Sequence, residues 1–148
     1  MEIIVRSAQL NDAKRIWEIR NEPESRAVAA NQEIIPLDQH IRWFENKYIR
    51  QKNNFCFVGE FEGNVIGYSR FDLEDDHYLS SIAVSSSMHG KGVGTILLRQ
   101  SVEQLKSLSP KPILAEIRKH NIASIKMFER VSFKKISENE KNVYYKLT

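Results

Sequence analysis

The stretch 88–97 (MHGKGVGTIL) carries three glycines at alternate positions between one apolar run and another. The run before it, 78–84 (YLSSIAV), predicts a strand. The run 93–108 predicts a helix, because its apolar residues recur on one face. A further apolar run, 113–117 (ILAEI), predicts a second strand. Two strands joined by a helix are expected to be parallel neighbours in one sheet, so this segment constrains the fold more than any other.

The remaining apolar runs predict the elements that complete the sheet. Further strands are expected at 2–8, 54–61, 64–73, 133–137 and 143–148, and further helices at 11–22, 36–51 and 121–131. Glu62 and Gly63 mark a hairpin, and Asn121 is expected to cap the last helix. The segment between the first two helices has no clear period and is expected to be a loop or an irregular helical turn. The prediction is a mixed α/β (α+β) fold with one parallel strand pair in an otherwise antiparallel sheet.

Length and composition indicate one ordinary globular domain, so we expect residues 1–148 to form a single domain. The chain is 41% hydrophobic and 28% charged, and no apolar run approaches the ~20 residues that span a bilayer. Its start lacks the basic and long apolar segments of a signal peptide. The single cysteine, Cys56, rules out an internal disulfide, and we expect a reducing, cytoplasmic setting with no membrane partner.

The charged residues and histidines argue against two non-enzymatic classes of protein. Lysine and arginine total 22 against 19 acidic residues, and no nucleic-acid recognition motif occurs, so no nucleic-acid partner is expected. The four histidines lack ligand spacing and the cysteine has no partner, so no metal site is expected.

A glycine-rich turn between a strand and a helix can bind an anion with its backbone N–H groups and the positive helix end. The pattern Gly90-x-Gly92-x-Gly94 is neither a Walker motif nor a dinucleotide fingerprint, since Thr95 stands where the latter needs glycine. Such glycines also form plain tight turns. Lys91 can add a charge to the site or stand in solvent.

The residues of this segment resemble the acyl-CoA-binding motif of the GNAT superfamily of N-acetyltransferases, [QR]-x-x-G-x-[GA] after a strand that ends in valine. In the stretch 82–98 (IAVSSSMHGKGVGTILL) the motif falls on His89, Gly92 and Gly94, with Val84 at the strand end. The stretch 121–133 (NIASIKMFERVSF) is similar to the second signature of the family. The matching order of elements covers nearly the whole chain.

The resemblance implies a mostly antiparallel seven-stranded sheet, flanked by about four helices, whose central parallel strands splay apart to admit acetyl-CoA. It implies a direct attack of a neutral amine on the thioester, with no metal. The implied donor-binding residues are Ile82, Ala83, Val84, His89, Gly90, Lys91, Gly92, Val93, Gly94, Thr95, Asn121 and Phe128. A homodimer is also compatible with the exposed closing strands of such a sheet.

The candidates for the base that deprotonates the amine are Glu116 and the residues of one acidic turn. Glu116, in the stretch 115–121 (AEIRKHN), matches the glutamate of ribosomal-protein alanine acetyltransferases; the alternative is an ordinary solvent-facing strand glutamate. His77 belongs to an acidic turn with Asp72, Glu74, Asp75 and Asp76, and a histidine can relay a proton because it titrates near 6.5. A charge run in a turn is also commonly just solvated.

Three residues depart from the family pattern. Phe128 stands where many relatives have the tyrosine that protonates the departing thiolate, and a phenyl ring cannot donate a proton. His89 replaces the usual arginine or glutamine, and Ser132 replaces the glycine before Phe133. These departures leave open a relative that binds acyl-CoA without turnover.

The segment 18–44 resembles the branch that includes the amino-sugar acetyltransferase of pseudaminic-acid biosynthesis. Its pattern falls on the implied acceptor-binding residues Arg20, Asn21, Arg26, His40 and Trp43. The expected acceptor is therefore a small-molecule amine, a nucleotide-linked amino sugar first, because arginines suit a diphosphate and an aromatic ring suits a base. The alternatives are a protein N terminus as acceptor, or a structural role in which the aromatic residues pack and the arginines are surface residues.

Overall fold

The computed structural model describes residues 2–29 and 32–148. The strands in this part of the chain are β1 (Ile4–Ser7), β2 (Phe55–Phe61), β3 (Asn64–Glu74), β4 (His77–Val84), β5 (Ile113–Arg118), β6 (Lys134–Glu138) and β7 (Asn142–Leu147). The α-helices are α1 (Ala13–Arg20), α2 (Pro23–Val28), α3 (Leu37–Phe44), α4 (Val93–Leu108) and α5 (Ile122–Arg130). A π-helical segment, Glu45–Arg50, extends α3.

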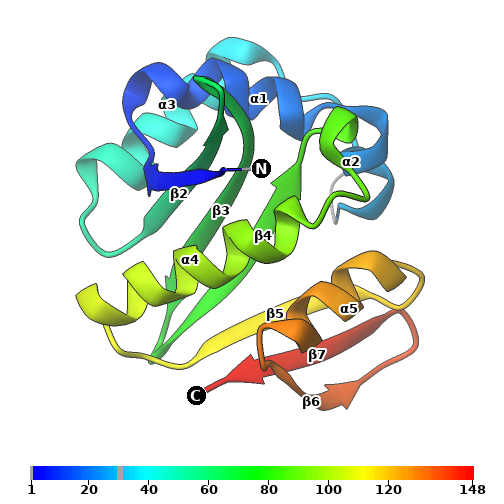
Figure 1. Ribbon diagram of the computed structural model, residues 1–148. Coiled ribbons are helices and arrows are strands. Elements are labelled where there is room, and N and C mark those ends of the chain that lie inside the picture. Colours follow the sequence, from blue (N-terminus) through cyan, green and yellow to red (C-terminus); the bar gives the residue numbers. More distant parts are fainter. Residues whose placement is uncertain (1, 30–31) are drawn as a thin grey trace.

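The strands form one sheet in the order β1-β2-β3-β4-β5-β7-β6 (Figure 1). Only β4 and β5 run parallel among the strand pairs of the described residues. The predicted mixed fold, with its crossover helix and single parallel pair, is confirmed.

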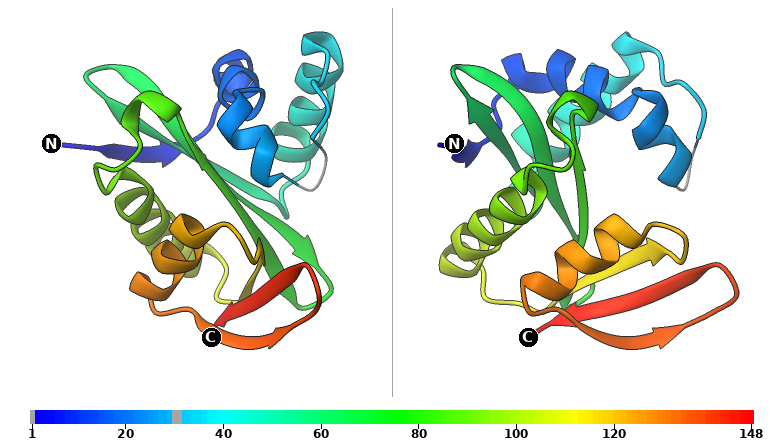
Figure 2. Two further views of the ribbon diagram at one scale, coloured as in Figure 1. Left: turned by 90° about the vertical axis from the view of Figure 1, so that its right-hand side faces the viewer. Right: turned by 45° about the vertical axis from the view of Figure 1, so that its right-hand side comes forward.

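The two faces of the sheet are covered by different helices. Figure 2 shows α1, α2 and α3 on one side of the sheet and α4 and α5 on the other. Side chains of a strand alternate between faces. On β3, Phe71 accordingly joins the core under α4 and Tyr68 joins the core under α1 and α3. The helix α4, which connects β4 to β5, therefore lies on one face of the sheet. The helices α1, α2 and α3 lie on the other face (Figure 2).

The parallel pair β4–β5 is hydrogen-bonded only near its start. Tyr78 pairs with Ile113 and Leu79 with Leu114, and no later pair follows within the described chain. In contrast, β4 stays paired with β3 as far as Val84. The strands diverge beyond Leu79, which Figure 1 shows as an opening angle between the two ribbons. The splay implied by the family resemblance is present.

Local signals account for most of the element boundaries. Glu62 and Gly63 both have positive φ values, 52° and 79°, as the tight hairpin turn requires. The Asn121 side chain accepts a hydrogen bond from the Ser124 N–H at 3.3 Å, so it caps α5 as predicted.

The structure differs from the sequence prediction at three places. The segment after α1, expected to be a loop or an irregular helical turn, contains the short helix α2, which Pro23 starts at its first position. The predicted helix over 36–51 ends as α-helix at Phe44 and continues as a π-helical turn. Asp72 lies in β3, within the strand expected at 64–73, and Glu74 extends this strand instead of lying in the acidic turn, because the pairing with β4 runs to the last residue before Asp75.

Candidate active site

The predicted donor-binding residues of β4 lie where this strand has left β5. Ile82, Ala83 and Val84 pair with the β3 residues 67–69 on one side, and no β5 residue pairs with them in the described structure. Their edge toward β5 therefore has no strand partner and, apart from the Val84 carbonyl that His89 occupies, can bond an extended ligand. This is the strand-like arrangement that an amide-bearing chain such as pantetheine requires.

The turn after β4 presents a row of backbone donors. The His89 N–H donates to the Ser86 carbonyl at 3.2 Å, so this amide is already used. The N–H groups of residues 90–95 have no hydrogen-bond acceptor within the described chain, and the first helical bond of α4 is that of Ile96 to the Gly92 carbonyl. Unpaired amides at the start of a 16-residue helix favour an anion.

The three glycines of the turn have two separate roles. Gly90 and Gly92 have φ values of 77° and 78°, a conformation that other residues rarely adopt, and no atom lies within 4 Å of a Cβ built on either. Gly94 is helical, and a Cβ there would lie 2.8 Å from the Met127 Sδ atom of α5. The first two glycines shape the turn, whereas Gly94 lets α4 pack against α5.

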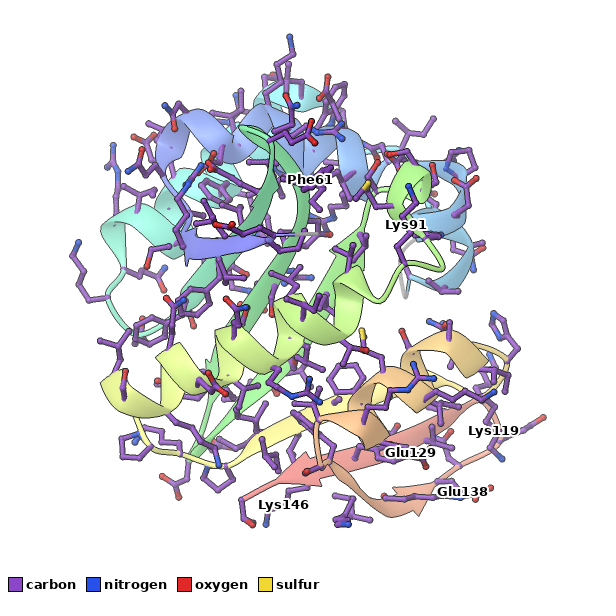
Figure 3. The ribbon with its side chains drawn as sticks, in the orientation of Figure 1. Phe61, Lys91, Lys119, Glu129, Glu138 and Lys146 are labelled. Atoms are coloured by element: carbon purple, nitrogen blue, oxygen red, sulfur yellow. The ribbon has the colours of Figure 1, made fainter. Side chains whose placement is uncertain are left out.

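The side chains of the turn have different surroundings. The Nε2 atom of His89 lies 2.8 Å from the Val84 carbonyl oxygen, so the imidazole donates back to β4 and ties the turn to the strand. Lys91 is exposed, and Figure 3 shows it on the loop between β4 and α4. Val93 is 1% exposed in the core, and Thr95 is half-buried in the first turn of α4.

The two α5 residues implied as donor-binding support the fold in the structure. Asn121 is engaged as the helix cap. Phe128 is 3% exposed, and its ring lies edge-on to Phe133 with centroids 4.9 Å apart. Ser132, in place of the family's glycine, keeps the glycine-like conformation at a φ of 75°.

Glu116 lies on β5 two residues beyond the last pair with β4. It is exposed and faces away from α4 and α5, since its neighbours Ala115 and Ile117 are buried in the core beneath those helices. Its Oε1 atom accepts a hydrogen bond from the Asn142 Nδ2 atom at 2.9 Å. The carboxylate is thus oriented from β7 at the point where the central strands part.

His77, the other candidate base, is not brought to the same place. It is the first residue of β4 and pairs with Glu74 at the closed end of the parallel strands. The strand register places Ser81 in line with Glu116, and His77 precedes Ser81 by four residues or about 13 Å. Among the two, only Glu116 lies at the divergence.

Two of the predicted acceptor-binding residues, Arg20 and Trp43, are in contact on the face opposite α4. The Arg20 guanidinium carbon lies 4.8 Å from the Trp43 ring centroid, a cation–π distance. Burial, and then the charge of Arg70, lower the pKa of Arg20 below its ordinary value.

The other three predicted acceptor-binding residues make bonds within the N-terminal helices. The Asn21 Oδ1 atom accepts from the Ile35 N–H at 3.2 Å, and the Arg26 Nε atom donates to the Asn21 carbonyl at 3.1 Å. His40 is 1% exposed, and its Nε2 atom lies 2.9 Å from the Ala13 carbonyl oxygen. Burial first, and the charge of Arg20 next, lower the pKa of His40 to about 4, so the ring is neutral near pH 7. These three residues hold α1, α2 and α3 together.

Sequence reasoning missed a cluster of polar residues beside Trp43. Arg70 of β3 donates to Asp72 at 2.8 Å, and the Tyr48 hydroxyl donates to the same carboxylate at 2.6 Å. Lys47 completes the cluster at 3.1 Å from Asp72. The available signal was the pair of charged residues at alternate positions in an otherwise apolar strand, since positions 70 and 72 face the same side.

Glu22, also missed, connects the N-terminal helices to the donor turn. One carboxylate oxygen accepts the Ser86 N–H at 2.8 Å, and the other accepts the Ser85 hydroxyl at 3.1 Å. Ser86 begins the 3-10 turn Ser86–Met88 that leads into the glycines. The junction of α1 and α2 is thereby fastened to the segment that precedes the free amides.

The matching family model covers most of the chain. The Acetyltransferase (GNAT) family model matches residues 13–133. The chain belongs to the GNAT family of acetyltransferases. In this GNAT-family chain, the turn amides without acceptors and the β4 residues without a β5 partner both lie beyond the point where the central strands part.

Two similar proteins carry names that describe amino acid acetylation. The L-2,4-diaminobutyric acid acetyltransferase of Nocardia farcinica is 29% identical over 133 residues, which are 87% of this chain and 63% of the relative. The chain thus spans less than two thirds of that protein. The L-methionine sulfoximine/L-methionine sulfone acetyltransferase of Salmonella typhimurium is 27% identical over 137 residues, which are 87% of this chain and 78% of the relative.

A solved GNAT-type structure agrees in fold. The structure of yncA from Salmonella typhimurium with its cofactor acetyl-CoA superposes with a TM-score of 0.82 at 22% identity, covering 99% of this chain and 93% of that one. At this identity the likeness concerns the fold alone.

The residues of this GNAT chain fit acetyl-CoA as the co-substrate. The free N–H groups of residues 90–95 suit the pyrophosphate, and the free β4 edge at 82–84 suits the pantetheine amides.

No group of three or more His, Cys, Asp or Glu residues in the described ranges could hold a metal ion. Likewise, no helix of residues 2–29 and 32–148 is long and apolar enough to cross a membrane.

Proposed function

We propose that this chain transfers the acetyl group of acetyl-CoA to the primary amine of a small acceptor that carries an anionic group. The observation that carries the proposal is the divergence of β4 and β5, with the free turn amides on one side and Glu116 on the other. Donor and amine can meet only where the strands part.

In the proposed reaction the neutral amine attacks the thioester carbonyl and a C–N bond forms. The C–S bond breaks, and CoA leaves as the thiolate, which takes a proton from water. Glu116 accepts the proton that the amine must lose, directly or through one water. Asn142 holds the Glu116 carboxylate in place for this step. Phe128 supplies no proton to the leaving thiolate, but a thiol with a pKa near 8.5 is a fair leaving group without one.

Two acceptor classes fit the proposal. The N-terminal segment favours a nucleotide-linked amino sugar, in which Arg20 would face the diphosphate and Trp43 the base. The names of the Nocardia and Salmonella relatives favour an amino acid. Both classes combine a primary amine with an anionic group, which is the chemistry that the positive charge near Trp43 suits.

The test is a thiol-release assay with acetyl-CoA and three sets of acceptors, namely UDP-linked amino sugars, L-amino acids and N-terminal peptides. We expect release with acceptors of the first or second set. Tight CoA binding by calorimetry, together with no release from any set, would contradict the proposal and support a non-catalytic acyl-CoA binder.

A further inference from the structure

Three cationic side chains surround the Trp43 ring. The Cζ atoms of Arg20 and Arg70 lie 4.8 Å and 5.4 Å from the ring centroid, and the Nζ atom of Lys47 lies at 5.6 Å. Asp72 alone among the described residues balances them, at 2.8 Å from Arg70 and 3.1 Å from Lys47. The cluster formed by Arg20, Trp43, Lys47, Arg70 and Asp72, here called the Trp43 cluster, therefore carries an excess of positive charge.

The two guanidinium groups of the Trp43 cluster are incompletely bonded. No carboxylate of the described chain lies within 4.0 Å of Arg20, and its guanidinium makes no hydrogen bond there. The Nε atom of Arg70 is buried without a hydrogen-bond partner, and the Arg70 side chain is 20% exposed. A ligand cannot reach the buried Arg70 Nε atom, but a half-buried guanidinium without a carboxylate partner, such as that of Arg20, is costly, and an anionic ligand would supply the missing partner.

The Trp43 cluster shares a sheet face with Glu116. Arg70 is the direct partner of Ser81 across β3 and β4. Leu79 and Leu114 are the last pair of the parallel strands, and Ser81 and Glu116 each lie two residues further on, so they face the same side of the sheet as that pair. Arg70 and Glu116 therefore flank the diverging strands, one from each side, on the face that α4 and α5 leave free.

The hollow beside the cluster is shallow. The residues lining it include Arg20, Trp43, Tyr48, Tyr68 and Arg70, and its empty volume of about 190 Å³ includes open solvent and holds no water-sized sphere, so a ligand would bind at its mouth. A carboxylate can accept two parallel hydrogen bonds from one guanidinium fork. A nucleotide diphosphate is larger and would need a wider space than this one.

We propose that Arg20 and Arg70, seated on Trp43, bind the carboxylate of the acceptor, so that the acceptor is an amino acid whose amine is directed to the divergence of β4 and β5. This inference rests on the proposed function, because it assigns the anion of the same acceptor. It adds specificity-determining residues, of which Arg70 lies outside the family motif.

The test measures binding instead of turnover. Calorimetry on the CoA-loaded protein would compare L-2,4-diaminobutyrate, L-methionine sulfone and the common L-amino acids with their carboxamides. We expect at least one amino acid to bind ten times or more tightly than its carboxamide. In Arg70→Gln and in Arg20→Gln this ratio should fall below about three.

Arg42→Gln is the matched control, because Arg42 lies on α3 but is 72% exposed and pairs only with Asp38 in the described structure. Its ratio should equal that of the wild type. Arg70→Lys, which keeps the charge and loses the fork, should give an intermediate ratio, and it keeps the test decisive where Arg70→Gln fails to fold.

Equal binding of acid and amide, no binding of any carboxylate of the set, or a ratio that survives in both glutamine variants would overturn the carboxylate assignment. Arginine-dependent binding of a UDP-amino sugar alone would overturn it too. Arginine-dependent carboxylate binding without thiol release would support the carboxylate subsite and contradict the proposed acetyl transfer. Failure of the subsite and failure of the proposed function are therefore distinguishable.

Discussion

The proposed donor side and the proposed acceptor side of this GNAT-family chain are built from different kinds of group. On the donor side, backbone amides of residues 90–95 and the free edge of β4 come from one continuous segment. On the acceptor side, the Trp43 cluster joins side chains from α1, the end of α3 and β3. A site made of backbone follows from local sequence, whereas a site made of side chains depends on which elements the fold brings together.

The largest expected effect is that of Gly92→Glu on the donor side. It places bulk and a negative charge among the free amides, each of which is worth about 1.5 to 3 kcal/mol toward a phosphate. CoA binding by calorimetry should be lost. Gly63→Glu is the control, because Gly63 has a φ of 79° against 78° for Gly92 and lies in the β2–β3 turn. Equal CoA affinity in the two variants would show that the turn does not bind the donor.

Glu116→Gln should lower kcat by about 10² to 10⁴ at neutral pH, because a positioned base commonly contributes that factor. The Kd for acetyl-CoA should not change. Glu103→Gln, on the exposed face of α4, is the control for a lost surface carboxylate. An unchanged kcat for Glu116→Gln would show that Glu116 is not the base. The account would then assign residues to acetyl-CoA binding but none to proton transfer.

A variant of His40 tests whether this buried residue of α3 stabilises the fold. Its pKa is lowered to about 4 in the native state against about 6.5 when unfolded, so only the unfolded chain takes up this proton as the pH falls. Stability from His40 is therefore fully present above pH 6.5 and is lost toward pH 4, by about 2 kcal/mol or more. Urea unfolding of His40→Gln should lack this part of the pH dependence, while exposed His120→Gln should keep it. A wild-type slope in His40→Gln would contradict the assignment.

Glu22→Gln tests the connection between the two sides. Loss of the charge weakens the bonds to Ser85 and Ser86, and since Glu22 is half-buried we expect a cost of about 1 kcal/mol. Hydrogen exchange of the bonded amides of Ser86, Met88 and His89 should become several-fold faster. The neighbouring exposed residue provides the control as Glu24→Gln, with unchanged exchange. If exchange is equally slow in both variants, the two sides are independent.

Ser132→Gly should have the smallest effect and concerns stability alone. Because Ser132 has a φ of 75°, glycine relieves strain there and should raise the free energy of unfolding by about 1 kcal/mol without changing kcat or KM. Ser107→Gly, the same replacement within α4, should lower it by about 0.5 to 1 kcal/mol. A change of KM in Ser132→Gly would mean that this departure from the family pattern affects the donor side.

Most of the fold could be predicted from the sequence because the signals are local. The period of 93–108 gave the whole of α4, Asn121 marked the start of α5, and Glu62 with Gly63 gave the β2–β3 turn. Helix α2 was missed, since it is six residues long and buries no side chain within the described structure.

The candidate site could be predicted only in part. The glycine turn and Glu116 lie in segments with motif spacing, and the structure brings both to the divergence of β4 and β5. Arg70 was missed because its neighbours Trp43 and Arg20 are 27 and 50 positions away in the chain, so no local pattern connects them. Glu74 was placed outside the strand because the length of a strand depends on its partner strand.

The measurement that tests the central claim most directly is amide hydrogen exchange of the wild-type chain with and without acetyl-CoA. The account predicts slower exchange at 90–95 and 82–84, where amides are free or face the divergence, and no change in β6. Protection confined to other segments, or no protection at saturating acetyl-CoA, would contradict it.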